Sequence, residues 1–530
     1  MRHKLLLGLG AVAVAGTGLA LLVTLQPAEI PASPVPIISL PSDVEDTGDE
    51  SVEWSEVGDQ PPRPVATLVV QVRDGDGKPL PARLTFIGIE GTHTPKFTRA
   101  DIGIERPGGI LAFDRAFIGG DATLLVPSGS YEVWFSHGPE YEAIAKEIHL
   151  GPTMMSSLGV TLRHVVDTPG WVSGDFHVHA EHSFDSKVPM RHRAYQFAAD
   201  GVDVIVATDH DVISDYAPVI AQLGLRERLV GLQGDEVTSR EWGHFGAFPL
   251  AGDDTLPDRG AITVKRRTPE TMFAELRSRW PDVLIDVHHP RLEKGKIGYF
   301  HLGELDTKTL KSKRAGFSFD FDSVEVLNGY QDPDRKSVDA VLADWFAFLR
   351  RGHRITATGN SDTHHLTFNL GGFPRNYVQM PDGPLADLDG AALARAVKAG
   401  HSFLTTGPIV EVTVGTQGLG DTIETRGRPL ALHVRVRAPA WMQVDRVTVL
   451  IDGVAAVRRP TLGLAPVRFD ETISIPMVRD AFVIVRVDGD RPMAPVIGDG
   501  RRFKVYPLAI TNPIWVDVDG DGKVTPSVAD

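Results

Sequence analysis

The sequence predicts an α/β protein, in which a barrel of alternating strands and helices is flanked by two β-sandwich-like regions. Short β-branched strands separated by turn residues fill residues 66–165, and β patterns return at 408–508. Between them, at 170–406, short apolar strands alternate with helical stretches such as "PETMFAELRSRW". Alternating strands and helices indicate a parallel sheet or barrel, whereas runs of short strands and turns indicate sandwiches.

These patterns divide the chain of 530 residues into five parts. The predicted parts are a signal peptide or N-terminal membrane anchor at 1–26, an acidic Pro-rich disordered tether at 27–64, an N-terminal β-sandwich at 65–166, the barrel at 167–407, and a C-terminal β-sandwich with a tail at 408–530.

The N-terminal segment predicts export. Arg2, His3 and Lys4 form a basic start, and an uninterrupted run of small and apolar residues follows at 5–23. A signal-peptide core is usually ~7–15 residues long and a membrane span ~20, so cleavage and anchoring both remain open. We expect the protein in the periplasm, outside the cell, or anchored in a membrane and facing away from the cytoplasm. The tether that follows is too acidic and too poor in apolar residues to fold alone.

Composition excludes several classes of function. The net charge of −15 argues against non-specific nucleic-acid binding, which needs clustered Lys and Arg. The chain has no cysteine, which excludes disulfides, Cys-ligated zinc and thiol catalysis. There is no Gly-rich phosphate loop and no G-x-S-x-G elbow, so Ser-His-Asp catalysis has no support. Any transition metal must be held by His, Asp and Glu, which suits Zn, Mn or Fe.

Five short segments of the barrel region carry nine of the 19 histidines. Each segment follows an apolar strand, and the C-terminal strand ends of such a barrel converge. This order predicts a metal centre made of imidazoles and carboxylates. The segments are 174–186 with His177, His179, His182 and Asp185; 207–211 with Asp209 and His210; 234–245 with Glu236 and His244; 286–291 with His288 and His289; and 359–365 with Asp362, His364 and His365.

The ordered set resembles the PHP (polymerase and histidinol phosphatase) superfamily, and "GDFHVHAEHSFDS" resembles its CehA/McbA-type metallohydrolases. The resemblance covers about residues 170–408 and implies a distorted PHP-type (β/α)7 barrel holding two or three divalent ions of Zn, Mn or Fe. It implies the following ligand sharing: His177, His179, Glu236 and Asp362 around one ion; Glu236 bridging to a second, completed by His244 and His289; and Asp185, His210 and His364 around a third.

Two positions of the set have alternatives. Asp185 stands one position later than in the commonest PHP pattern, so His182 is an alternative ligand. The family places a His directly before the Pro, which favours His289 over His288. His288, His365 and Asp209 are expected to support the ligands or to face substrate.

Other residues of the barrel region remain open. Glu325 and Asn328, which end the strand in "SVEVLNG", suit capping and function equally. Arg291, with Lys294 or Lys296, could bind an anionic substrate group, or could lie in a solvated loop. The predicted catalytic residues are Glu236, Asp362, His364 and Arg291.

The resemblance implies a metal-dependent hydrolase that cleaves a phosphoester with a metal-bound hydroxide. The same centre could instead hydrolyse a carboxylic ester, amide or carbamate, and a third hypothesis is an anchored binding protein with a non-catalytic barrel. The expected partner is a small, anionic molecule and not nucleic acid. Separately, residues 517–522 match the start of an EF-hand loop, but Val528 stands where that loop needs a bidentate Glu, so calcium binding and a plain turn both stay open.

Overall fold

The computed structural model describes residues 64–98, 101–292, 298–329, 336–461, 463–500 and 504–526. These residues belong to one unit of the chain, Val57–Asp530. The predicted leader and nearly all of the predicted tether lie outside the described residues, as do Lys294 and Lys296. Within the described part, no helix has the length and apolar character needed to cross a membrane.

The first strands form two sheets that share an apolar core. Alternation in "VATLVVQVR" buries Leu68 and Val70, which pack in one cluster with Leu84 and Phe86 of the other sheet. The first sheet has the order β6-β1-β9 and the second the order β3-β4-β5-β2-β7-β8. Their bounds are β1 Val65–Arg73, β2 Ala82–Gly88, β3 Ile104–Arg106, β4 Gly109–Ala112, β5 Arg115–Ile118, β6 Asp121–Pro127, β7 Gly129–Ser136, β8 Ile144–Leu150 and β9 Met155–Thr161.

The strands that carry the five segments are divided between two further sheets. In one sheet β12, β11 and β10 are parallel neighbours and β20 pairs with β10 in the antiparallel sense; the other has the order β13-β14-β15-β18-β19. The bounds are β10 Trp171–Val178, β11 Val204–Ala207, β12 Val230–Gln233, β13 Asp235–Ser239, β14 Gly243–Phe248, β15 Leu284–Val287, β18 Ser323–Asn328, β19 Thr356–Asn360 and β20 Arg375–Gln379.

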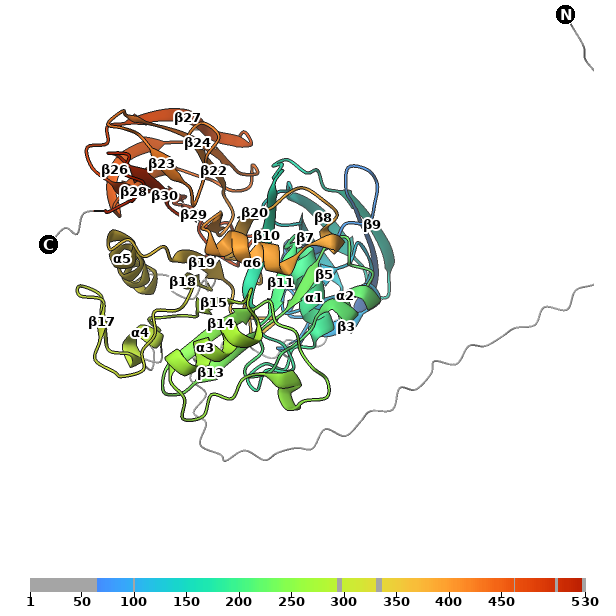
Figure 1. Cartoon of the computed structure of the whole chain (residues 1–530). Helices are drawn as coiled ribbons and strands as arrows, with labels where there is room; N and C mark the ends of the chain where they lie inside the picture. The colour runs from blue at the N-terminus through green and yellow to red at the C-terminus, as the bar shows by residue number, and fades with distance from the viewer. Residues whose placement is uncertain are drawn as a thin grey trace, which may run out of the picture. The chain divides into compact units, whose positions relative to one another are not determined.

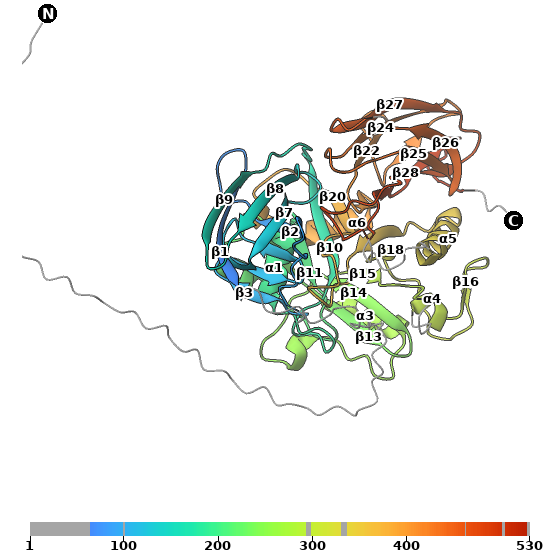
Figure 2. The same cartoon turned by 180° about the vertical axis from the view of Figure 1, so that it is seen from behind.

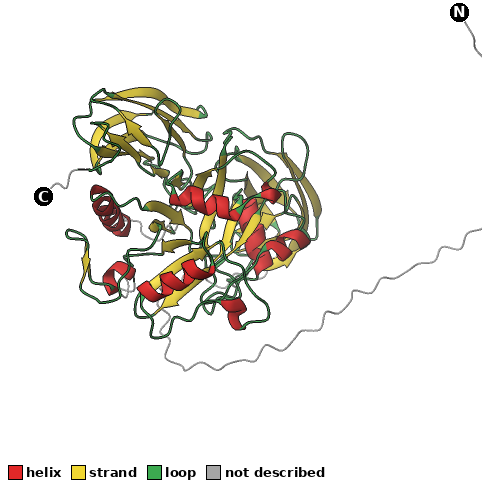
Figure 3. Ribbon diagram, in the orientation of Figure 1, coloured by secondary structure: helices red, strands yellow, loops and turns green. Residues whose placement is uncertain are grey.

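Two isolated parallel bridges link these sheets, one between Val178 and Thr363 and one between His210 and Glu236. Strand β10, which ends at the bridged Val178, and strand β11, which precedes the bridged His210, lie side by side in both views (Figure 1 and Figure 2). However, β13 and β14 form an antiparallel hairpin with no helix between them. A regular (β/α)7 barrel is therefore not confirmed. The fold is mixed α/β, with many strands and few helices (Figure 3).

The C-terminal strands extend the sheet that contains β10, because β21 pairs with both β20 and β29. The sheet thus continues across residue 407, and the five predicted domain boundaries stay predictions. The remaining strands are β16 Leu305–Asp306, β17 Lys311–Ser312, β21 Ser402–Thr405, β22 Ile409–Thr413, β23 Thr422–Glu424, β24 Leu430–Arg437, β25 Arg446–Ile451, β26 Val454–Pro460, β27 Val467–Ile475, β28 Ala481–Asp488, β29 Leu508–Thr511 and β30 Ile514–Asp517.

The helices cover the strands with apolar faces. Phe273 of α3 packs edge-to-face on Phe245 of β14 with ring centroids 4.9 Å apart, and buried Trp345 and Phe348 of α5 join the same core. The helices are α1 Met190–Ala199, α2 Ala217–Gln222, α3 Pro269–Arg279, α4 Tyr299–Leu302, α5 Lys336–Arg350 and α6 Gly390–Lys398, with short 3₁₀ turns at Pro257–Gly260 and Leu385–Asp387.

Candidate metal centre

The first two imidazoles of the site come from the end of β10. His177 and His179 are two residues apart, so an extended chain directs both side chains to the same face. Both residues are fully buried. The backbone ties this end of β10 to the segment after β19, because Asp362 N–H donates to His177 O at 2.9 Å and His179 N–H to Thr363 O at 3.2 Å.

Strands β13 and β14 contribute Glu236 and His244, and His210 follows β11. The bridge between His210 and Glu236 brings the end of β11 to β13. Gly246, which pairs with Glu236 in the hairpin, leaves room for the ring of His288. A Cβ atom at Gly246 would lie 2.2 Å from His288 Nε2, so this glycine is required for the close approach.

The loops after β15 and β19 contribute His289, Asp362 and His364. His289 has a φ of 29° and Asp362 a φ of 48°. Non-glycine residues in this left-handed region cost of order 1–3 kcal/mol each and cluster at functional sites. The neighbouring contacts must therefore hold both residues in place.

The structure brings together all nine residues predicted to hold metal. Within each group, one candidate ligand atom per residue lies within 4.8 Å of the others. Four overlapping groups result: His177, His179 and Asp362; His177, Glu236 and His289; His210, Glu236 and His244; and His179, Asp185, His210 and His364. These groups could hold metal ions.

Glu236 lies between several imidazoles. Its Oε1 is 3.0 Å from His177 Nε2 and 3.4 Å from His244 Nδ1, and its Oε2 is 2.8 Å from His210 Nδ1. His289 Nε2 is 3.6 Å from Oε1. A carboxylate with imidazoles on both oxygens is suited to bridge two ions.

The other two carboxylates of the set are arranged similarly. Asp362 Oδ1 lies 3.2 Å from His177 Nε2 and 3.3 Å from His179 Nε2. Asp185 Oδ2 lies 3.0 Å from His210 Nε2 and 3.1 Å from His364 Nε2. Despite its offset in the sequence, Asp185 thus lies beside both of the imidazoles with which the resemblance groups it.

Six buried atoms of the set make no hydrogen bond of normal geometry to any described residue, although Glu236 Oε2 lies 2.8 Å from His210 Nδ1 and 3.5 Å from His179 Nε2. Buried polar atoms are nearly always paired, so each exception needs an explanation. Divalent metal ions would account for these atoms, because the atoms carry lone pairs and belong to residue types that bind Zn, Mn or Fe. They are His177 Nε2, His179 Nε2, Glu236 Oε2, His244 Nδ1, His289 Nδ1 and Asp362 Oδ1.

Electrostatics keeps the carboxylates of the set ionised. Burial raises the pKa of Glu236, but the imidazoles of His177, His244 and His210 outweigh burial and hold this pKa well below its usual range. The same balance lowers the pKa of Asp362. Burial also lowers the pKa of His244 to about 4, so His244 is neutral at pH 7. At His210, by contrast, Glu236 and Asp185 outweigh burial and raise the pKa to about 10. The carboxylates and His244 are thus in the forms that bind metal, whereas metal binding at His210 would release its proton.

Four other candidate residues of the five segments belong to none of the four groups. His288 Nδ1 lies 2.7 Å from Glu236 Oε1, and its ring stacks on that of His177 at 3.5 Å. Asp209 Oδ1 accepts from Ala180 N at 2.7 Å, and His365 lies 3.3 Å from Asp101. His182, the alternative to Asp185, lies 3.0 Å from Ser214 Oγ and belongs to none of the groups above.

Arg291 has a carboxylate partner outside the set. Its Nε donates to Asp344 Oδ2 of α5 at 2.5 Å, and its guanidinium lies over the ring of Phe300. These contacts give Arg291 a structural role, and its expected role in binding an anionic substrate group stays a prediction.

Glu325 and Asn328, for which the sequence favoured neither capping nor function, contact candidate ligands directly. Glu325 Oε1 lies 3.0 Å from His177 Nδ1, and Asn328 Nδ2 lies 3.0 Å from Asp362 Oδ2. The only signal in the sequence was that both stand at the end of an apolar strand, a position they share with the predicted ligands.

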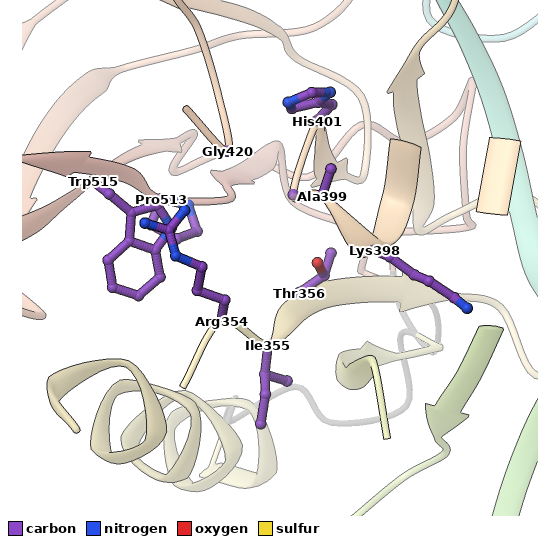
Figure 4. Close-up of a pocket in the computed structure, with 10 residues that line it drawn as sticks. Arg354, Ile355, Thr356, Lys398, Ala399, His401, Gly420, Pro513 and Trp515 are labelled. Carbon is purple, nitrogen blue, oxygen red and sulfur yellow. The ribbon is translucent and has the colours of Figure 1, made fainter. Parts of the chain in front are cut away.

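A cavity at the other end of β19 contains none of the nine residues. It has a volume of about 210 Å³, and its lining includes Arg354, Lys398 and His401. The three basic side chains extend in different directions, with Arg354 towards Trp515 (Figure 4). Arg354 donates to Thr422 Oγ1 at 2.8 Å, and Lys398 lies 3.8 Å from Asp322. The cations therefore do not converge on a common point.

A further acidic group lies near the C-terminus, where Asp480, Asp517 and Asp519 come together. The Asp517 oxygens accept from Gly520 N and Gly522 N at 2.7 and 2.9 Å, as expected for a turn. Calcium binding at this loop stays a prediction.

Comparisons with known proteins give only remote likenesses. No family model and no curated protein matches the chain. Among solved structures, a two-domain protein from Bacteroides vulgatus, described as containing a predicted PHP-like metal-dependent phosphoesterase, is 15% identical, with 66% of this chain and 97% of that chain covered and a TM-score of 0.33. PsfC from Pseudomonas syringae is 16% identical, with 43% and 88% covered and a TM-score of 0.28.

The similar structures also include the lesion-specific endonuclease Q of Pyrococcus furiosus. It is 16% identical, with 43% of this chain and 56% of that chain covered and a TM-score of 0.28. At these identities and TM-scores the likenesses carry no argument about function. Any inference of function must therefore be argued from the geometry of the site.

Proposed function

We propose that this protein is a metal-dependent hydrolase that cleaves a phosphoester. One observation carries the proposal: nine imidazoles and carboxylates from five separate segments meet in overlapping groups, and six of their buried atoms have no hydrogen-bond partner among the described residues. The expected cofactors are two or three ions of Zn, Mn or Fe, distributed over the residues as the resemblance to the PHP superfamily implies.

When bound, the ions would polarise a phosphoryl or carbonyl oxygen and lower the pKa of a bound water to ~7, which supplies a nucleophile at neutral pH. The residues of the chain have other tasks. Glu236 contacts imidazoles of several segments and so fixes the spacing of the centre. Three carboxylates also give the site three negative charges when its imidazoles are neutral, which favours divalent cations.

In a centre of two ions, where His364 binds no metal, His364 is our candidate for proton transfer in the reaction. Its Nε2 lies 3.1 Å from Asp185, and its ring stacks on His179 at 4.0 Å. The side chain is about one fifth exposed, whereas those of His177 and His179 are fully buried. A partly exposed imidazole at the edge of the set is suited to exchange a proton with substrate or solvent.

The same centre would also suit a carboxylic ester, an amide or a carbamate. A panel of aryl phosphate, aryl phosphodiester and aryl ester substrates, assayed with added Zn, Mn or Fe, tests the proposal. We expect metal-dependent cleavage that is fastest on a phosphate substrate. Faster ester cleavage would correct the substrate class, and no cleavage by a metal-loaded protein would favour an anchored binding protein.

Glu236→Gln is the matched control for this panel. It keeps the shape of the side chain, but it removes the negative charge that two ions would share. We expect loss of metal-dependent cleavage on every substrate of the panel. Cleavage that persists in this variant would come from another site or from a contaminating enzyme.

The expected substrate is small and anionic, and we propose that the protein acts after export from the cytoplasm. Nucleic acid is not the expected substrate, and a DNA duplex with an abasic lesion belongs in the panel as a test. Efficient incision of that duplex would overturn this part of the proposal.

A further inference from the structure

Two polar residues at the end of β18, Glu325 and Asn328, contact three of the candidate ligands. They are three residues apart, a spacing that in a regular strand directs side chains to opposite faces. The pairing register of β18 with β19 shifts between Glu325 and Leu327, which marks a bulge. As a result both side chains reach the same face, where Asn328 Nδ2 donates to Glu325 Oε2 at 2.8 Å.

Glu325 is a buried carboxylate with all of its acceptor positions in use. Its Oε1 accepts from His177 Nδ1 and from Asn360 Nδ2, both at 3.0 Å. Its Oε2 accepts from the backbone N–H of His289 and from Asn328 Nδ2, both at 2.8 Å. An ionised carboxylate has about four acceptor positions, so none is left to bind a metal ion.

The Glu325 contact decides how His177 meets the rest of the set. A carboxylate only accepts, so His177 Nδ1 carries the proton. Its Nε2 then faces Glu236 and Asp362 at 3.0 and 3.2 Å and makes no hydrogen bond to any described residue. A histidine ligand held in this way presents its free nitrogen in a fixed direction.

Asn328 acts on Asp362 in the same manner. Its amide hydrogens are shared between Glu325 Oε2 and Asp362 Oδ2, at 2.8 and 3.0 Å. With Oδ2 engaged, Asp362 directs Oδ1 at His177 and His179, and within the described part of the chain this Oδ1 has no hydrogen-bond partner. The hydrogen bonds from His289 N to Glu325 and from Asn328 to Asp362 also hold the two ligand residues that have a positive φ.

We propose that Glu325 and Asn328 are positioning residues that orient His177, His289 and Asp362 for metal binding. This inference rests on the proposed metal centre. A carboxylate is required at position 325 because both of its oxygens must accept. Glutamine would direct its NH2 group at another donor, whichever way its amide is turned.

Cobalt(II) titration of the metal-free full-length protein tests the pair, because cobalt absorption reports both affinity and coordination geometry. Glu325→Gln should weaken cobalt binding about 10- to 100-fold, the usual range for the hydrogen-bond partner of a metal ligand. It should also change the absorption spectrum, and at saturating metal it should lower kcat more than it raises KM. Asn328→Ala should have the same effects to a smaller degree.

Asp286→Asn is the matched control. Asp286 is a buried carboxyl on the neighbouring strand β15, and it accepts from Ser323 Oγ at 2.9 Å and Thr358 Oγ1 at 2.7 Å. Neither partner belongs to the metal set. We expect Asp286→Asn to leave the cobalt affinity and spectrum unchanged, although it changes a buried carboxyl in the same core.

Each outcome decides a separate point. Unchanged cobalt affinity and spectrum in Glu325→Gln would overturn the positioning role, and so would an equal loss in Asp286→Asn. If Glu325→Gln does not fold, Asn328→Ala decides by the same criteria. A wild-type protein that binds cobalt but cleaves no substrate would overturn the hydrolase while the pair keeps its role. A wild-type protein that binds no cobalt would overturn the metal centre and the pair together.

Discussion

Two buried groups of polar side chains differ in the source of their positive charge. Near the end of α1, Asp200 pairs with Arg83 at 2.5 Å, and Arg375 Nη2 donates to Asp200 O at 2.8 Å. Here the chain provides its own cations. In the candidate metal centre, the three carboxylates form ion pairs only with imidazoles as far as the described residues go.

The difference separates a structural group from a functional one. In the first group a permanently charged guanidinium balances the buried carboxylate, so the group is complete as folded. In the second, the imidazoles balance the carboxylates only while they are protonated. Imidazoles that bind metal in their neutral form would leave the three carboxylates to be balanced by a cation from solution. Unpaired buried atoms that carry lone pairs on both His and carboxylate therefore point to a cation from solution.

Removal of two ligands should break the metal centre completely. We expect His177→Ala together with His179→Ala to abolish metal binding and hydrolysis, because these imidazoles enter three of the four groups. Metal content and the aryl phosphate rate measure the effect. Full activity in a folded double variant would refute the assignment.

The buried group of Arg83, Asp200 and Arg375, which we call the arginine cluster, should respond in the opposite way. Arg83→Met leaves Asp200 as a buried unpaired charge, so we expect the free energy of unfolding to fall by about 3–5 kcal/mol. Metal stoichiometry should stay as in the wild type. Urea denaturation and metal analysis measure the two effects.

Arg163→Met is the control for this variant. It breaks the exposed ion pair between Arg163 and Glu142, whose atoms lie 2.7 Å apart. Exposed pairs of this kind contribute little to stability, because water and salt screen their charges. Equal losses of stability in Arg83→Met and Arg163→Met would contradict the structural role of the buried pair.

Chelation should destabilise the wild type but not the double variant. Ligands that bind only the folded state stabilise it by about 2.7 kcal/mol at a concentration 100 times Kd. We therefore expect the Tm to fall when a chelator removes the metal and to recover when Zn or Mn is added. A Tm unaffected by chelation would contradict a metal-filled centre.

A smaller effect should come from His137, which borders the arginine cluster. Burial and the nearby charges of Arg228 and Arg375 lower the pKa of His137 to about 3. The unfolded chain binds the proton below pH 6.5 and the folded chain only below about 3. Stability from neutral His137 is therefore complete above pH 6.5 and is lost towards pH 3, by about 1.4 kcal/mol per pH unit.

Urea denaturation of metal-free protein between pH 6.5 and 4 measures this loss. His137→Gln cannot take up the proton, so its free energy of unfolding should fall less steeply with decreasing pH than that of the wild type. Equal slopes in the two proteins would show that His137 is not the group responsible.

The sequence predicted which residues come together better than it predicted the fold around them. Regular strands followed by His, Asp or Glu identified nine residues that the structure brings together, among them Asp185 in spite of its offset. The β13–β14 hairpin interrupts the expected alternation of strands and helices, and only tertiary pairing reveals this.

Contacts between segments that lie far apart in the chain could not be predicted from the sequence. Glu325 has the same strand-end position as a ligand, but its four hydrogen bonds show that its oxygens are occupied. Arg291 follows the ligand segment directly and suited an anionic substrate, yet Asp344, 53 residues away, pairs with it. Such partners depend on which helix packs beside the loop.

Elemental analysis of the purified full-length protein tests the central claim most directly. After supply of Zn, Mn or Fe and removal of free metal, we predict at least two divalent ions per chain, and loss of metal in the His177→Ala, His179→Ala double variant. Less than one ion per folded chain, or equal content in the two proteins, would contradict the account.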